Sequence, residues 1–357
     1  MNDLFTSNTF ADLLTTLRRL ECEDSVNAWP HQQLNAMTAA GVMTWDVPTS
    51  FGGIDLSPVD QVQGLRQLAA CCLVSTFILT QRSAAVRRIA TSENSDAKQT
   101  WLPELLAGNI FATVGISHLT TSGQHLKSPR VTAEPVGDGF ILNGVVPWAT
   151  GATMADLLVT GGTLPDGREV LVCLPTRRPG VSAQPPVELL GLNASQTGTV
   201  TLDNVDVEAA ELLHGPLEGV MRHGTGGGAG SIGTSALAIG AAAGTLRQFS
   251  EEADKRPDLR EFTQPLQDEC NRLTDDLLMA ASGTHPAGDA AAEQLRRAAN
   301  SLVLRSAQAW LAATKGAGYV AGHPAAQAVR ESLFFLVWSC PQPVLAANLR
   351  ELACTSG

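Results

Sequence analysis

The sequence predicts an α+β protein in which an N-terminal helical domain precedes a central antiparallel β-sheet or small barrel, and a C-terminal helical bundle follows. Two observations predict this order: the spacing of apolar residues changes twice along the 357-residue chain, and turn-forming residues concentrate in its middle third. Helical spacing covers 1–110, short strand-like segments cover 111–210, and helical spacing returns over 211–357. These three ranges are the predicted domains.

The N-terminal third predicts several helices. The first has one apolar face, formed by Phe10, Leu13, Leu14, Leu17 and Leu20, with Asn8 or Thr9 as its cap. A second helix is expected around 34–40, ending at Gly41. Ser57 before Pro58 is a typical helix start, since a serine side chain caps free N–H groups and proline fits the first turn. Further helices are expected over 75–91 and 95–107.

The middle third predicts six strands, over 111–117, 130–135, 139–147, 156–161, 168–174 and 198–207. Within the third strand, Asn143-Gly144 separates two apolar runs. Because Asn-Gly is a common two-residue turn, we expect a hairpin across residues 140–146. Just beyond it, the indole of Trp148 and the hydroxyl of Thr150 would suit contact with a flat ligand; alternatively, Trp148 is a core aromatic and Thr150 a turn residue.

The last third predicts closely packed helices. Their apolar faces are narrow and rich in small residues: Leu266, Cys270, Leu273 and Leu277 on one, and Leu295, Ala298, Ala299, Leu302 and Ala309 on another. Such stripes suit a bundle that extends into an oligomer. Gly228–Gly233 matches GxGxxG, but no strand precedes it, so we interpret it as a loop leading into a small-residue helix rather than a dinucleotide site.

Composition excludes several classes of function. The formal net charge of −11 argues against a nucleic-acid partner, because phosphate binding needs clustered Lys and Arg. The seven cysteines form no CxxC pair and the seven histidines are scattered, so no metal site is expected. Scattered, odd-numbered cysteines favour reduced thiols and a cytoplasmic location. We find neither a signal peptide nor an apolar run long enough to span a membrane.

Local stretches in the same helix–strand–helix order resemble the acyl-CoA dehydrogenase family of flavoproteins. The resemblance covers nearly the whole chain. It is carried by GVMTWDVPTSFGG (41–53), TWLPELLAGN (100–109), VGISHL (114–119), DGFILNGVVPWATGATMADLLVT (138–160), LLGLNASQTGTVTLDNVDV (189–207), ATKGAGY (313–319) and AVRESLFF (328–335). The stretch 138–160 is the strongest match. At 193 the chain has Asn where the family has Arg, whereas Ser195 keeps the family's serine.

The resemblance implies an FAD site between the sheet domain and the helical domain, with FMN, or a lost flavin site, as the alternatives. Its isoalloxazine ring would meet two segments, Ile116–Ser117 and Trp148–Ala149–Thr150. Arg256 would reach the FAD pyrophosphate of a neighbouring subunit in a homodimer or homotetramer. Gly316 and Gly318 would let the backbone approach the same cofactor. Ordinary structural roles are the alternatives for each, with Arg256 as a solvated helix end.

The resemblance also exposes a missing catalytic group. Removing the α-proton of an acyl thioester needs a base, and the family's glutamate position corresponds here to Ser339. The helix expected from Ser231 carries no carboxylate up to Leu246. Glu331 is interpreted as an ion-pair or capping acid, and Cys340 as a buried thiol. The catalytic residue and the substrate-binding residues are therefore unassigned.

Three interpretations remain open. The first is a FAD-dependent oxidoreductase acting on a CH–CH group of a small acyl substrate such as a CoA thioester, with an unidentified base. The second is a flavin-dependent monooxygenase of the same fold, for which the acid–base candidates are His118, His223 and His323. The third is a non-catalytic family member that serves as an interaction or scaffold protein. For the CoA phosphates, the nearest suggestions are Arg222 with His223, or Arg177 with Arg178.

Overall fold

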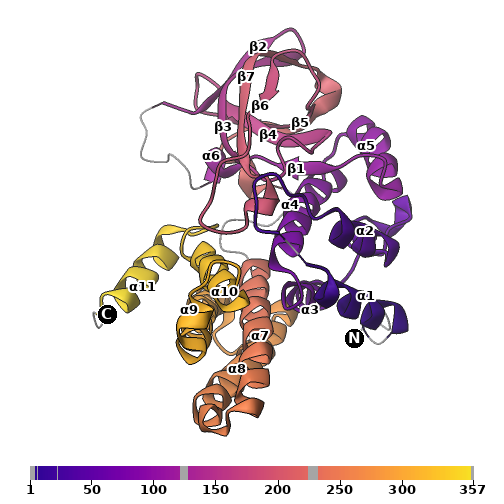
Figure 1. Cartoon of the computed structure of the whole chain (residues 1–357). Coiled ribbons are helices and arrows are strands. Elements are labelled where there is room, and N and C mark those ends of the chain that lie inside the picture. The colour runs from indigo at the N-terminus through magenta and orange to yellow at the C-terminus, as the bar shows by residue number, and fades with distance from the viewer. Residues whose placement is uncertain (1–4, 6, 22, 121–127, 224–231, 355–357) are drawn as a thin grey trace.

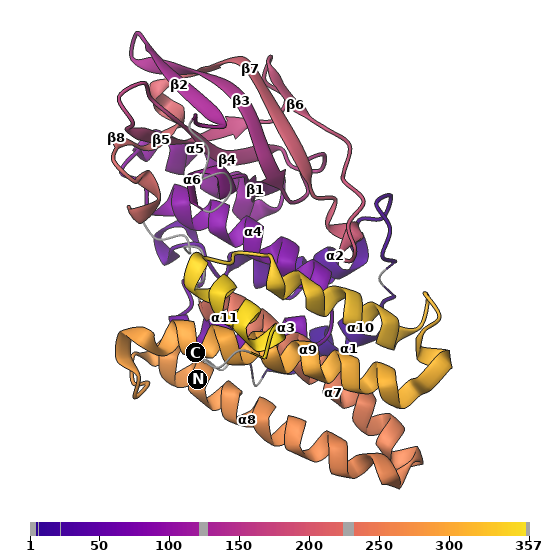
Figure 2. The ribbon, with the colours of Figure 1, turned by 90° about the vertical axis from the view of Figure 1, so that its left-hand side faces the viewer.

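The computed structural model describes the chain except for residues 1–4, 6, 22, 121–127, 224–231 and 355–357. The β-sheet lies at one end of the molecule, and helices from both ends of the chain lie beneath it (Figure 1). In the perpendicular view the long helix α4 (Leu73–Ala90) separates the sheet from the C-terminal helices (Figure 2). The predicted helix–strand–helix order is confirmed.

The N-terminal helices follow the predicted signals closely. Besides α4 they are α1 (Asn8–Arg19), α2 (His31–Ala39), α3 (Pro58–Ala69) and α5 (Ser95–Ala107). Ser57 caps α3 by accepting a hydrogen bond from the Asp60 N–H. The cap of α1 is Ser7 rather than Asn8 or Thr9, because its hydroxyl accepts from the Phe10 N–H.

In the part of the chain that the structure describes, eight strands form one mixed, mostly antiparallel sheet. Their bounds are β1 (Ala112–Val114), β2 (Val131–Val136), β3 (Gly139–Ala149), β4 (Leu157–Thr163), β5 (Glu169–Pro175), β6 (Val181–Ala183), β7 (Gly198–Val207) and β8 (Leu212–Leu217). The order is β6-β7-β3-β2-β4-β5-β8, and β1 pairs with β4. The β1–β4 and β2–β4 pairs are parallel, whereas the others are antiparallel.

Two of the strands, β6 and β8, were not predicted from the sequence. Both β6 and β8 lie at an edge of the sheet, where short or proline-containing strands are tolerated. Strand β6 has three residues, and β8 contains Pro216. The sheet therefore continues past position 210, and the long helices resume only at Ile232. The domain boundaries remain predictions.

The hairpin expected across residues 140–146 is wrong. Strand β3 runs unbroken through Asn143 and Gly144, and its register against β7 shifts between Leu142 and Gly144. Gly144 has a φ of 136°, and a Cβ there would lie 2.1 Å from the Arg130 carbonyl oxygen. The Asn-Gly pair thus marks a bulge, which needs the same permissive backbone as a turn. The β2–β3 hairpin instead turns between Val136 and Gly139.

The C-terminal helices are α7 (Ile232–Lys255), α8 (Arg260–Ser282), α9 (Ala291–Gly318), α10 (Pro324–Leu333) and α11 (Gln342–Leu352). Helix α7 packs closely on α3, because a Cβ at Gly240 would lie 2.3 Å from the Arg66 carbonyl oxygen. The predicted small-residue helix is confirmed from Ile232 onwards. Residues 228–231 of the GxGxxG match lie outside the described part of the chain.

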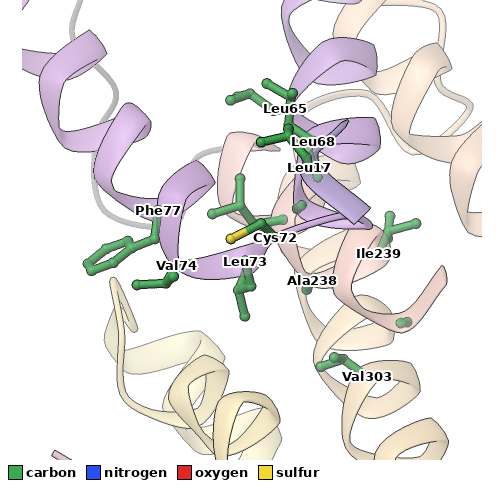
Figure 3. Packing of buried hydrophobic residues seen from close by; sticks show 14 of the residues in the cluster. Leu17, Leu65, Leu68, Cys72, Leu73, Val74, Phe77, Ala238, Ile239 and Val303 are labelled. Atoms are coloured by element: carbon green, nitrogen blue, oxygen red, sulfur yellow. The ribbon is translucent and has the colours of Figure 1, made fainter. Parts of the chain in front are cut away.

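The helices from the two ends of the chain share one hydrophobic core. Leu17 of α1 and Leu65 and Leu68 of α3 meet Ile239 of α7 and Val303 of α9 (Figure 3). Two smaller cores lie within the sheet and between the sheet and helices α4 and α5. Within the described residues, no helix is long and apolar enough to cross a membrane. The same residues contain no cluster of His, Cys, Asp and Glu suited to a metal ion.

Candidate functional site

A cavity of about 880 Å³ lies between the sheet and the helices. One wall comes from the sheet: the end of β1, the short helix α6 (Ser117–Thr120), the end of β3 and the loop before β7. The other wall comes from α3, α4, the start of α7 and the end of α10 with the turn that follows it. The volume is in the range of small-molecule and cofactor sites.

Trp148 lies in the sheet wall. Its side chain lines the cavity, and the residue is 47% exposed, so it is not a core aromatic. Between Val146 and Ala149 the register of β3 against β7 shifts again. A bulge redirects side chains from the regular alternation, and this one turns the indole towards the cavity.

The same wall of the cavity carries several hydroxyl groups. Thr150 lines the cavity, and its Oγ1 accepts from Thr197 Oγ1 at 3.3 Å. Thr197 Oγ1 lies 2.8 Å from Ser195 Oγ. The Thr150 backbone is fixed because its carbonyl oxygen accepts from Thr113 Oγ1 at 2.7 Å. This chain of hydroxyls gives the sheet wall a polar, hydrogen-bonding edge.

Ser117 contributes a buried hydroxyl without a partner. Ile116 and Ser117 both line the cavity, and no hydrogen-bond partner is recorded for Ser117 Oγ. A buried polar atom without a partner is costly, so such an atom beside a cavity indicates that a ligand completes its bonding. An indole and several hydroxyls in one cavity fit the flat, polar-edged ring of a flavin.

The other predicted cofactor contacts lie elsewhere. The Ala149 side chain is buried in the core of the sheet. Arg256 donates from Nη1 to the Ala313 carbonyl oxygen at 2.7 Å, where α7 ends beside α9. Gly316 is exposed and Gly318 buried near that same end of α9. Arg256 and both glycines are separate from the cavity lining.

The helical wall contains residues that the sequence analysis did not assign. Phe77, Thr80, Gln81, Ala84 and Arg87 of α4 all line the cavity. Their spacing of three or four residues places them on one helix face. This face combines an aromatic residue with polar residues at positions 80, 81 and 87, and that combination at helical spacing was the available signal. The expectation for 75–91 concerned secondary structure alone.

The segment after α10 completes this wall. Phe334, Trp338 and Ser339 line the cavity. The rings of Phe334 and Trp338 stack with centroids 5.0 Å apart and planes 14° apart. Ser339, which the sequence resemblance predicts to replace the family's glutamate, has a φ of 47°, a conformation uncommon for non-glycine residues.

The described part of the cavity lining has no acidic side chain. Among the lining residues that the structure describes there is also no His or Lys, and the charged groups are Arg87 and Arg330. Arg87 pairs with Asp46 at 2.7 Å, and Arg330 with Asp24 at 3.5 Å. Each arginine therefore has a carboxylate nearby, and the described lining contains no group suited to take an α-proton as a general base.

Glu331 lies beside this wall without lining it. Burial raises the pKa of its carboxyl to about 7; Cys72 and Asp24 also raise it, whereas a hydrogen bond from Gln327 and the charge of Arg330 lower it. Gln327 Nε2 donates to Glu331 Oε1 at 2.8 Å. The neighbouring Arg330 pairs with Asp24, so the ion-pairing role suggested for Glu331 falls to a different acid.

The histidine candidates have structural surroundings. His118 Nε2 donates to the Gly161 carbonyl oxygen at 2.9 Å, and burial lowers the pKa of its imidazole. His323 caps α10, since its Nδ1 accepts from the Ala325 N–H. His223 is exposed. All three are separate from the cavity lining.

Comparison with known proteins points to one family. Residues 9–109 match the model of the acyl-CoA dehydrogenase N-terminal domain. A probable acyl-CoA dehydrogenase of Bacillus subtilis, YngJ, is 26% identical over 252 residues, which are 68% of this chain and 64% of that protein. The dibenzothiophene monooxygenase of Mycolicibacterium goodii is 26% identical over 227 residues, or 60% of this chain and 54% of that protein.

The fold agrees with these matches. The butyryl-CoA dehydrogenase of Megasphaera elsdenii superposes with a TM-score of 0.80 at 16% sequence identity, covering 97% of this chain and 98% of that one. At such low identity the superposition shows the fold alone. Residues 9–109 match the acyl-CoA dehydrogenase N-terminal domain, and the chain as a whole has the acyl-CoA dehydrogenase-like fold.

Proposed function

We propose that this protein is a flavin-dependent oxidoreductase that holds FAD, or alternatively FMN, in the cavity between the sheet and the helices. The observation that carries the proposal is the Ser117 hydroxyl, buried without a partner in a cavity that also exposes the Trp148 indole. Trp148 would contact the flat ring, and the hydroxyls of Ser117 and Thr150 would hydrogen-bond its polar edge. Members of the family bind FAD or FMN.

Of the possible reactions, we favour oxygen-dependent oxidation of the substrate. The described lining contains no carboxylate or imidazole, which disfavours a reaction that needs a protein base at the substrate carbon. A bound reduced flavin would supply two electrons to O₂ and the substrate the other two, so that one oxygen atom is added to the substrate and the other takes up two protons and leaves as water. The electrons would come from reduced nicotinamide through a separate reductase.

In this proposal the protein's own groups bind and orient the cofactor, and they exclude water from the cavity. The sheet wall holds the cofactor through the indole and the hydroxyls. The helical wall excludes water through Phe77, Phe334 and Trp338, which protects a reactive cofactor from side reactions.

Dehydrogenation of an acyl thioester is the second candidate. The similarity to a protein named as a probable acyl-CoA dehydrogenase supports it, and Ser339 lines the cavity. The Ser339→Glu variant tests whether position 339 still faces the substrate. If it does, butyryl-CoA bleaches the flavin absorbance of the variant without added reductant, whereas the parent protein stays coloured.

The decisive experiment is to purify the protein and measure its flavin. A yellow protein whose released cofactor is FAD or FMN supports the proposal, whereas a colourless protein that takes up neither flavin overturns it and leaves the scaffold interpretation. With flavin present, O₂ uptake that requires NADH and a flavin reductase supports oxygenation. Bleaching of the parent protein by an acyl-CoA would replace oxygenation with dehydrogenation.

The assembly and location are also proposals. Arg256, Gly316 and Gly318 lie apart from the cavity lining, so a role in cofactor binding would require a neighbouring subunit. We therefore propose a homodimer or homotetramer. The scattered, odd-numbered cysteines support the separate proposal of a cytoplasmic location. Light scattering gives the subunit number, and Arg256→Gln should lower flavin content only if the subunits exchange contacts in this way.

A further inference from the structure

Three aromatic side chains form one continuous surface of the helical wall. Phe334 and Trp338 stack face to face, and Phe77 of α4 meets them edge-on, with ring centroids 4.8 Å from Phe334 and 5.0 Å from Trp338. Phe77 belongs to the same core as Leu65 and Leu68 and is 5% exposed. Figure 3 shows its ring pointing away from those two leucines, and its ring contacts place it against the segment after α10. All three side chains line the cavity. We call Phe77, Phe334 and Trp338 the aromatic wall.

A buried polar network fixes the backbone of this wall. Arg296 of α9 is fully buried, and its Nη2 donates to the carbonyl oxygens of Phe335 at 3.3 Å and Trp338 at 2.9 Å. Asn300, one turn along α9 and also fully buried, donates from Nδ2 to the Phe335 carbonyl oxygen at 3.0 Å. Two side chains from one rigid helix thus hold the main chain that carries Phe334 and Trp338. A fixed wall binds a ring with little loss of conformational entropy.

The charges around the cavity disfavour an ionic ligand. Its two lining arginines each have a carboxylate nearby, Asp46 for Arg87 and Asp24 for Arg330. The described lining residues include no carboxylate that could attract a cation. On α4, next to the aromatic wall, Thr80 and Gln81 add a hydroxyl and an amide. Thr80 Oγ1 donates to the Phe77 carbonyl oxygen at 2.6 Å and accepts from Gln81 Nε2 at 3.0 Å. These bonds orient the Gln81 amide, whose oxygen can accept from one polar substituent.

We infer that the substrate is a flat, uncharged aromatic molecule with a small polar substituent, bound against the aromatic wall with that substituent near Thr80 and Gln81. An aromatic ring gains stacking and edge-to-face contacts with this wall that a flexible acyl chain or a puckered ring of the same size lacks. This inference rests on the proposed function, because it assigns the part of the cavity that the flavin leaves free.

The test compares two ligands that share a carbon skeleton but differ in flatness. Calorimetry measures binding of 1-naphthol and of decahydro-1-naphthol to the protein as purified, with its flavin content recorded. We expect 1-naphthol to bind about tenfold more tightly, the ratio that one good aromatic contact gives. Octanoyl-CoA provides the acyl arm and should bind more weakly than 1-naphthol. Equal affinities for the two naphthols, or tighter binding of octanoyl-CoA, overturn the inference.

Matched variants locate the ring. Trp338→Phe keeps an aromatic side chain and should preserve the tenfold ratio, whereas Trp338→Leu keeps apolar volume and should reduce the ratio to about twofold. Trp148→Leu, at the sheet wall, should leave the ratio near tenfold. If Trp148→Leu abolishes the ratio and Trp338→Leu does not, the ring binds at the sheet wall and the inference fails.

The flavin measurement separates this inference from the proposed function. A colourless protein that still discriminates the naphthols through Trp338 refutes the cofactor and keeps the aromatic site. A flavin-containing protein that binds both naphthols equally keeps the cofactor and refutes the aromatic site.

Discussion

The two walls of the cavity differ in chemistry and in origin. The sheet wall offers an exposed indole and several hydroxyls, of which the one on Ser117 has no recorded partner. The helical wall offers stacked and edge-on aromatic rings held from behind by Arg296 and Asn300. The sheet wall therefore suits a ligand with a hydrogen-bonding edge, and the helical wall suits one bound by its faces. This contrast is why we propose that the cofactor binds the first wall and the substrate the second.

The largest expected effect comes from forcing the helical wall apart. In Gly240→Ala the new methyl group would meet the Arg66 carbonyl oxygen and the Ala69 side chain, so α7 and α3 must separate. We expect a loss of about 3 kcal/mol in the free energy of unfolding, measured by urea denaturation. Gly322→Ala is the control, since a Cβ there meets nothing within 4 Å. Equal stability of the two variants would contradict the close packing of α7 on α3.

The second effect concerns the buried acid beside the helical wall. Because the pKa of Glu331 rises to about 7 on folding, from its ordinary value of 4.5, folding favours its neutral form. The contribution of the neutral carboxyl to the free energy of unfolding is thus complete below about pH 4.5 and is lost as the pH rises through 7. Glu331→Gln should leave stability unchanged at pH 4.5 and raise it by about 2 kcal/mol at pH 8.

Urea denaturation at both pH values measures this effect. The exposed Glu218→Gln is the control and should alter stability little at either pH. A Glu331→Gln variant that is no more stable than the parent at pH 8 would show that Glu331 ionises freely in the folded protein.

The third effect tests the sheet wall. Trp148→Ala should weaken flavin binding about tenfold. Because the indole is half-exposed, its main contribution is to the binding free energy of the ligand rather than to the stability of the fold. Fluorescence titration of the flavin-free protein measures the dissociation constant. Phe262→Ala removes another half-exposed aromatic, on α8, away from the cavity lining, and should leave the constant unchanged. Unchanged flavin binding in Trp148→Ala would remove the indole from the site.

The smallest effect isolates a single hydroxyl. Ser117→Ala should weaken flavin binding about fivefold, because one neutral hydrogen bond contributes about 1 kcal/mol to the binding free energy. The flavin-free protein should lose no stability, since Ser117 Oγ has no recorded partner to lose. The exposed Ser182→Ala controls for a general effect of losing a hydroxyl. A stability loss in Ser117→Ala without a change in flavin affinity would give the hydroxyl a structural role.

The sequence predicted the sheet wall better than the helical wall, for a physical reason. Trp148 and Thr150 lie in one short stretch, so a local pattern brought them to notice. Phe77 and Trp338 are 261 positions apart, and only packing brings them together. The Asn143-Gly144 signal was real but ambiguous, because a bulge and a hairpin turn both need a permissive backbone. Helices with strong caps, such as the one beginning after Ser57, were predicted closely.

The hydrophobic core that joins α1 and α3 to α7 and α9 constrains how the chain is made. The first helices leave the ribosome well before α7 and α9 exist, so their apolar faces have no partner during synthesis. Those apolar faces stay exposed to solvent, or are bound by a chaperone, until the C-terminal helices have been synthesised. Expression of residues 1–110 alone would therefore yield aggregation-prone material, whereas supplying the missing helices in trans should restore a soluble complex.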